Sequence, residues 1–123
     1  MKKEQSLNNA LKLLQEYRSA LLRKTLLEAV PGMSDKDLDN CVEQVNLTQE
    51  IVQDLRNNRL LGEKLYWVIY ASYLTERQPI DVDEILDYIA KEYERIPRRT
   101  FFRMRGRALQ TLEARLTEKS KAR

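Results

Sequence analysis

The sequence is poor in the residues that form turns, ligate metals or cross-link chains. Three glycines and three prolines make up about 5% of its 123 residues, against a typical share of roughly 12%. So few turn-forming residues favour long helices over a many-stranded β fold. There is no histidine and one cysteine, Cys41. This excludes catalytic triads built on histidine, Cys/His zinc sites and a disulfide within the chain.

Long apolar runs are also lacking. The longest, Tyr66–Ala71, is far shorter than the ~20 residues that span a bilayer. The first residues lead into an amphipathic pattern and not into the apolar core of a signal peptide. We therefore expect a cytoplasmic protein without a membrane partner, in which Cys41 is a buried thiol.

Charge is distributed unevenly along the chain. Residues 1–60 carry nine basic and nine acidic side chains, and residues 61–94 carry three basic and eight acidic ones. Residues 95–123 carry ten basic and two acidic side chains. The formal net charge of +3 therefore conceals a strongly basic C-terminal region behind an acidic segment.

Hydrophobic periodicity predicts an all-α fold of about five helices. Apolar residues at three- and four-residue spacings indicate helices over about 7–30, 34–56, 60–77, 81–93 and 97–118. Breaks fall at Pro31-Gly32, at Asn57-Asn58 and at Gln78-Pro79. Two helix starts, Ser34 to Asp37 and Asp81 to Glu84, resemble capping boxes, and Pro97 suits a first helical position. The expected buried side of the fourth helix consists of Ile85, Leu86, Ile89, Ala90 and Tyr93.

These helices divide into a hairpin over residues 1–58, a three-helix unit over 59–119 and a tail, 120–123, that we expect to be disordered. The hairpin has a longer apolar seam than a small domain needs. It either forms a homodimer through residues 7–58 or packs on the third helix as core. The aromatic cluster Tyr66–Tyr73 is either core or a platform for nucleobases; the lack of interleaved cations favours core.

The strongest functional signal is a run of arginines. Six arginines and no carboxylate lie between Arg95 and Arg107. One helical face is apolar throughout, with Phe101, Met104, Ala108, Leu109 and Leu112. If this face packs inward, the basic residues point to solvent. Ordinary exposed faces mix charges of both signs, so a face with positive charge alone favours nucleic acid as a partner. The planar guanidinium group of arginine also fits phosphates and guanine edges. The candidate DNA-binding residues are Arg95, Arg98, Arg99, Thr100, Phe102, Arg103, Arg105, Gly106 and Arg107.

Each candidate has an expected role. Arg98, Arg99 and Arg103 lie nearest the base edges, whereas Arg95, Arg105 and Arg107 meet phosphates. Phe102 contacts a thymine methyl group or the sugar-phosphate backbone. Thr100 bonds either a phosphate or its own helix backbone. Gly106 allows either a close approach of DNA or a tight helix crossing.

The region before and within the last helix resembles a helix-turn-helix. Its apolar positions follow that pattern at Ile89, Ala90, Tyr93, Ile96 and Phe101. The helix that follows ends in Ala108-Leu109-x-x-Leu112, as does the recognition helix in region four of bacterial sigma factors. Residues 99–105 with Ala108-Leu109, and the helix over 66–74, resemble the small phage-encoded transcriptional regulators of the ArpU and RinA type. That resemblance covers about residues 60–116.

The resemblance implies a regulator of phage or prophage late genes in a bacterial host cell. Such a protein binds double-stranded DNA sequence-specifically, with the helix over 97–118 in the major groove. It also implies a contact between the acidic segment 76–94 and RNA polymerase.

Two other functions use the same arginines. One is a helical adaptor that binds an acidic protein through the Arg95–Arg107 face, and the other is a DNA-packaging accessory protein without sequence preference. Enzymatic activity is not expected, because the carboxylates fall on capping positions and exposed faces with no glycine-rich phosphate loop nearby. The sequence indicates no cofactor, no metal and no small-molecule substrate.

Overall fold

The computed structural model describes residues 2–30, 32 and 35–121, which form five α-helices and no strand. The all-α prediction is confirmed. The helices are α1 (Lys2–Ala29), α2 (Asp35–Asp54), α3 (Gly62–Ile69), α4 (Val82–Glu92) and α5 (Arg98–Lys121). A 3₁₀ turn, η1 (Leu55–Asn57), follows α2, and a π-helical turn, η2 (Tyr70–Leu74), continues α3. Over this part of the chain, no helix combines the length and the apolar character needed to cross a membrane.

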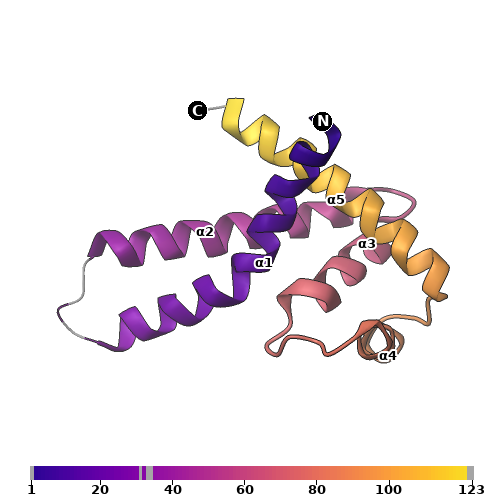
Figure 1. The fold of residues 1–123 in the computed structure, drawn as a ribbon, viewed down its shortest axis with the longest axis horizontal. Helices are drawn as coiled ribbons and strands as arrows, with labels where there is room; N and C mark the ends of the chain where they lie inside the picture. The colour runs from indigo at the N-terminus through magenta and orange to yellow at the C-terminus, as the bar shows by residue number, and fades with distance from the viewer. Residues whose placement is uncertain (1, 31, 33–34, 122–123) are drawn as a thin grey trace.

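Helices α1 and α2 pair as an antiparallel arm that extends to one side of a body made of α3, α4 and α5 (Figure 1). The N-terminal part of α1 crosses α5. One apolar cluster runs through the inner arm and the body, so that Leu14 and Ile51 belong to the same core as Leu65 and Phe101. The outer end of the arm carries exposed leucines, Leu22 and Leu26.

Several helix ends follow the predicted signals. Helix α1 ends at Ala29, before the expected break, and Gly32 adopts a positive φ of 88°. At the start of α4, Asp81 Oδ1 accepts a hydrogen bond from the Glu84 amide at 2.9 Å. Glu84 Oε2 in turn accepts from the Ile80 amide at 3.1 Å, one residue earlier than in the usual capping box. The other proposed box begins at Ser34, which lies outside the described residues.

Other ends differ from their predictions by a few residues. The third helix begins at Gly62 and its π turn ends at Leu74. Arg18 of α1 fixes this end, since its guanidinium donates to the carbonyl and the hydroxyl of Thr75 at 2.8 and 3.0 Å. Pro97 caps α5, its carbonyl accepting from the Phe101 amide at 2.9 Å.

The last helix is longer than predicted. Helix α5 continues to Lys121 and so includes the first two residues of the segment 120–123 expected as a disordered tail. Residues 122–123 lie outside the described part of the chain.

Helix α4 buries a narrower side than the sequence predicts. Ile85 and Ile89 are buried and Leu86 is half-buried, but Ala90 is exposed and Tyr93 is 37% exposed. The prediction was wrong for Ala90 because it lies about 100° around the helix from Ile89, outside the stripe that faces the body. It was wrong for Tyr93 because α4 ends at Glu92, and the Tyr93 ring stacks on Trp67 at a centroid distance of 6.4 Å instead of entering the core.

A buried carboxylate joins α5 to α1. Glu113 is 8% exposed, and its two oxygens accept hydrogen bonds from the Ala10 amide at 2.8 Å and from Asn9 Nδ2 at 3.0 Å. These bonds connect residues more than a hundred positions apart. They fix the inner end of the arm to the C-terminal half of α5.

Replacing this carboxylate should destabilise the fold. Glu113→Ala removes the acceptor of two donors, and we expect the free energy of unfolding to fall by about 1–3 kcal/mol. Glu118→Ala is the matched control. Its carboxylate is exposed and, among the residues whose side chains are described, pairs with Arg115 alone, so we expect a change of about 0.5 kcal/mol or less. Urea denaturation followed by circular dichroism measures both; equal effects would contradict the linking role of Glu113.

Candidate nucleic-acid interface

The rotation of α5 about its own axis is set by its apolar stripe. Phe101, Ala108 and Leu112 are completely buried, and Met104 is 7% exposed. The stripe packs against α3 and α1. The predicted inward face is therefore confirmed, with Leu109 half-buried at its edge.

The opposite side of α5 is basic and open. Arg99, Arg103 and Gly106 follow one another at i, i+4 and i+7 along the line farthest from the core, and all three are exposed. Arg107 is exposed beside Arg103, and Arg95 is exposed just before the helix. We call Arg95, Arg99, Arg103 and Arg107 the basic face of α5. No residue in the described part of the chain forms an ion pair or hydrogen bond with these four side chains.

The position of this face leaves it accessible. The first half of α5, drawn in orange, lies at the end of the molecule away from the arm (Figure 1). The amides of Arg98, Arg99 and Thr100 have no helical acceptor, because the first intrahelical bond starts at Phe101. These amides add the positive end of the helix dipole to the arginine side chains, which favours an anionic ligand.

Phe102 is held within the cationic region. Its ring is 41% exposed and lies perpendicular to Phe101, with ring centroids 5.3 Å apart and an interplanar angle of 71°. The guanidinium carbons of Arg98 and Arg105 lie 6.0 and 5.1 Å from its centre. Three neighbours therefore restrict an apolar side chain that faces solvent, which suits it to contact a base or a sugar.

Two arginines are placed differently from the rest. Arg98 is exposed, but its Nη1 lies 3.0 Å from Oδ1 of Asp83 in α4. Such an exposed ion pair is weak and exchanges readily for a phosphate. Arg105 is half-buried, and its guanidinium lies over the rings of Phe101 and Phe102. Burial raises the pKa of the Tyr73 phenol, and the nearby positive charge of Arg105 opposes this rise. Arg105 thus packs against rings and supports Phe102, and its expected contact with a phosphate stays a prediction.

The remaining two candidates are Thr100 and Gly106. Thr100 is half-buried, and within the described chain its hydroxyl forms no hydrogen bond with the helix backbone, contrary to one of its two predicted roles. A Cβ atom added at Gly106 would meet nothing within 4 Å. A tight helix crossing therefore does not explain this glycine, whose presence costs a helix interior about 1 kcal/mol relative to alanine.

Sequence reasoning missed two residues of this region. Gln110 is exposed and extends the line of Arg99, Arg103 and Gly106 by one turn. Its i+11 spacing from Arg99 predicts that it lies on the same side of the helix, but Gln110 carries no charge and so does not belong to the run of arginines. Asp83 belongs to the acidic segment 76–94, and nothing in the local sequence places it beside Arg98.

The acidic residues show no arrangement for metal chemistry. Across residues 9–30, 32 and 36–118, for which side chains are described, no group of three or more acidic or cysteine side chains is placed to hold a metal ion. Asp81 and Glu84 serve as helix caps.

Comparison of the chain with protein-family models, curated proteins and solved structures gives no match in any of the three.

The open surroundings of Gly106 lead to a stability prediction. Gly106→Ala should raise the free energy of unfolding by up to about 1 kcal/mol, because alanine is the better helix former and its methyl group meets no neighbour. Gly62→Ala is the contrasting variant. Its Cβ would lie 2.6 Å from the Arg56 carbonyl oxygen, so α3 or η1 must shift and stability should fall. Thermal unfolding compares the two; a loss of stability in Gly106→Ala would contradict this description.

Proposed function

We propose that this protein binds double-stranded DNA sequence-specifically with the first half of α5 in the major groove, as a transcriptional regulator of the phage or prophage type. The single observation that carries the proposal is the basic face of α5. It bears four exposed arginines without partners in the described chain, on a helix whose other side is fixed in the core. The resemblance to sigma region four and to ArpU- and RinA-type regulators supports the same function.

The dimensions and chemistry of a duplex agree with this surface. The major groove is about 12 Å wide and admits one α-helix. Arg99 and Arg103 then face the base edges, where arginine prefers the O6 and N7 atoms of guanine. Arg95 and Arg107 lie to the sides, toward the phosphates, and the free amides at the start of the helix offer further donors to a phosphate.

An adaptor for an acidic protein is the second candidate, and the same four arginines would serve it. Two further features favour the duplex. Phe102 is an exposed apolar group of the kind that contacts thymine methyl groups, and Gly106 leaves the helix backbone uncovered where a DNA strand would approach. A packaging accessory protein would use the same surface without sequence preference.

Substitutions on the basic face should separate base contacts from phosphate contacts. Selection of bound fragments from a random DNA pool identifies the preferred sequence. On this sequence we expect Arg99→Ala and Arg103→Ala each to weaken the binding free energy by about 1–3 kcal/mol and to relax the base preference at particular positions. Arg107→Ala should weaken binding to all sequences equally and reduce the salt slope by about 1. Fluorescence anisotropy titrations at several salt concentrations measure both effects.

Two controls accompany these titrations. Glu118→Ala should leave DNA binding unchanged. Gly106→Ala should weaken it although the helix becomes more stable, which separates binding from folding. Equal behaviour of the three arginine variants would contradict the assigned roles. A protein that binds no DNA but binds an acidic protein through the same arginines would be the adaptor.

We further propose that two copies associate through the outer end of the arm. A single helix reads few base pairs, so specific binding generally requires a second copy. Leu22 and Leu26 lie four residues apart on α1 and are 62 and 56% exposed. Val30, just past the end of the helix, is 48% exposed, and the three residues form an apolar stripe that α2 does not cover. The inner arm belongs to the core, which leaves this outer stripe as the part of residues 7–58 available to a partner.

The oligomeric state tests the stripe directly. We expect the full chain to sediment as a dimer at micromolar concentration and the double variant Leu22→Gln/Leu26→Gln to sediment as a monomer with an unchanged circular dichroism spectrum. Leu60→Gln is the matched control, because Leu60 is 92% exposed but lies in the turn before α3. A wild-type protein that stays monomeric would refute the dimer without affecting the DNA contact.

A further inference from the structure

A second surface, of opposite charge, lies between α3 and α4. Tyr66 and Tyr70 stack with centroids 5.7 Å apart and planes 26° apart, and Tyr70 and Tyr88 stack at 6.4 Å and 22°. All three rings are half-buried. Tyr66 and Tyr70 pack against the core on one side, as expected for the aromatic cluster, and Tyr88 of α4 extends them into a row that is open to solvent on the other side.

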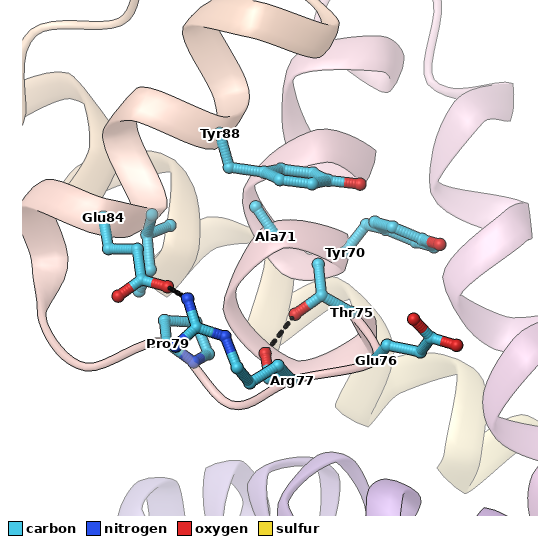
Figure 2. A pocket seen from close by; sticks show the side chains of 9 residues that line it. Tyr70, Ala71, Thr75, Glu76, Arg77, Pro79, Glu84 and Tyr88 are labelled. Carbon is cyan, nitrogen blue, oxygen red and sulfur yellow. Dashed lines mark hydrogen bonds and ion pairs between the residues drawn. The ribbon is translucent and has the colours of Figure 1, made fainter.

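A hollow of about 590 Å³ lies at the α4 end of this row. The rings of Tyr70 and Tyr88 line one side with Ala71 between them, and Arg77, Pro79 and Glu84 face them across the opening (Figure 2). Glu76 lies at the rim on the Tyr70 side (Figure 2). Burial is the main cause that raises the pKa of Tyr88, so this phenol stays uncharged at neutral pH.

The ionisable groups of the hollow are unequally engaged. Arg77 forms an ion pair with Glu84 Oε1, which places this cation at the mouth. Glu76 is exposed, and none of the described residues pairs with its carboxylate. Acidic side chains outnumber basic ones by eight to three over residues 61–94, so the surrounding surface attracts cations.

The other end of the tyrosine row shows what such a surface binds. The guanidinium carbon of Arg56 lies 3.7 Å from the centre of the Tyr66 ring. Glu63 Oε1 is 3.1 Å from Arg56 Nε, in an ion pair whose angle falls short of a hydrogen bond. An aromatic face and a carboxylate thus hold one guanidinium within the chain itself. The hollow offers the same two components, tyrosine faces and the carboxylate of Glu76.

We propose that this hollow binds an arginine side chain from a segment of a partner protein. The guanidinium lies against the face of Tyr70 or Tyr88 and pairs with Glu76. Arg77 competes with the partner's guanidinium, because it already pairs with the carboxylate of Glu84. A nucleic acid is the poorer occupant, because its phosphates would meet the carboxylates of this surface.

Peptide titration tests the proposal on the full-length chain. The probe is a fluorescein-labelled twelve-residue Gly/Ser peptide with three arginines, and its matched control carries citrulline at the same positions. We expect saturable binding of the arginine peptide by fluorescence anisotropy and at least tenfold weaker binding of the citrulline peptide, which lacks the charge.

Variants then locate the site. Glu76→Gln and Tyr88→Leu should each lower the affinity for the arginine peptide roughly three- to tenfold, whereas Tyr88→Phe should retain binding. Arg77→Ala should strengthen binding, because it removes a competing cation and releases Glu84. This gain cannot come from a misfolded variant. Glu43→Gln, which removes an exposed carboxylate from α2, should change nothing.

The result is independent of DNA binding. Arg103→Ala should leave peptide binding unchanged, and Glu76→Gln should leave DNA binding unchanged. Equal affinity for the two peptides, or equal binding by Glu76→Gln, Arg77→Ala and the wild type, would overturn the proposal. Binding of a single-stranded oligonucleotide that Tyr88→Leu abolishes would overturn it in favour of a nucleobase platform.

Discussion

Burial of one apolar stripe on α5 determines what the rest of the molecule presents to solvent. The stripe packs against α3 and α1 and consists of Phe101, Met104, Ala108 and Leu112. Because an α-helix is rigid, fixing this side in the core also fixes the direction of the arginines on the opposite side. A rotation by one residue, about 100°, would expose Phe101 and carry arginines toward the core. Burying an unpaired guanidinium costs several kcal/mol, so core packing and charge exclude that alternative together.

The same constraint separates the two charged surfaces. The basic face of α5 and the carboxylates around α4 belong to adjacent helices. Among the described residues, one ion pair joins these two helices, and it connects Arg98, outside the basic face, with Asp83. Charges that do not neutralise each other within the chain remain available to partners of opposite sign. A molecule with a basic end and an acidic side also orients itself near DNA, since the acidic side is repelled by the phosphates.

The predictable part of this structure is the part encoded in local spacing. The helices, the cap at Asp81 and the outward direction of Arg99 and Arg103 all follow from residues within a few turns of each other. Other features depend on contacts between distant segments. Glu113 gains its role from the backbone of Ala10, Arg105 from neighbouring rings, and Ala90 loses its predicted burial because α4 packs through a narrow stripe. No periodicity in the sequence reports which elements meet, so these features required the coordinates.

The arm links dimer geometry to the spacing of DNA half-sites. Glu113 attaches α5 to α1 at Ala10, and the proposed dimer stripe is centred on Leu26, sixteen residues farther along the helix. At ~1.5 Å per residue this distance is at most ~24 Å, so two copies joined antiparallel at Leu26 hold their α5 attachments no more than ~48 Å apart. One turn of B-DNA spans about 34 Å. An arm-tip dimer therefore holds the two α5 helices apart by the length of two arms, whereas a dimer formed by the bodies would bring the two recognition helices closer. The spacing recovered from selected DNA thus reports which surface joins the two copies.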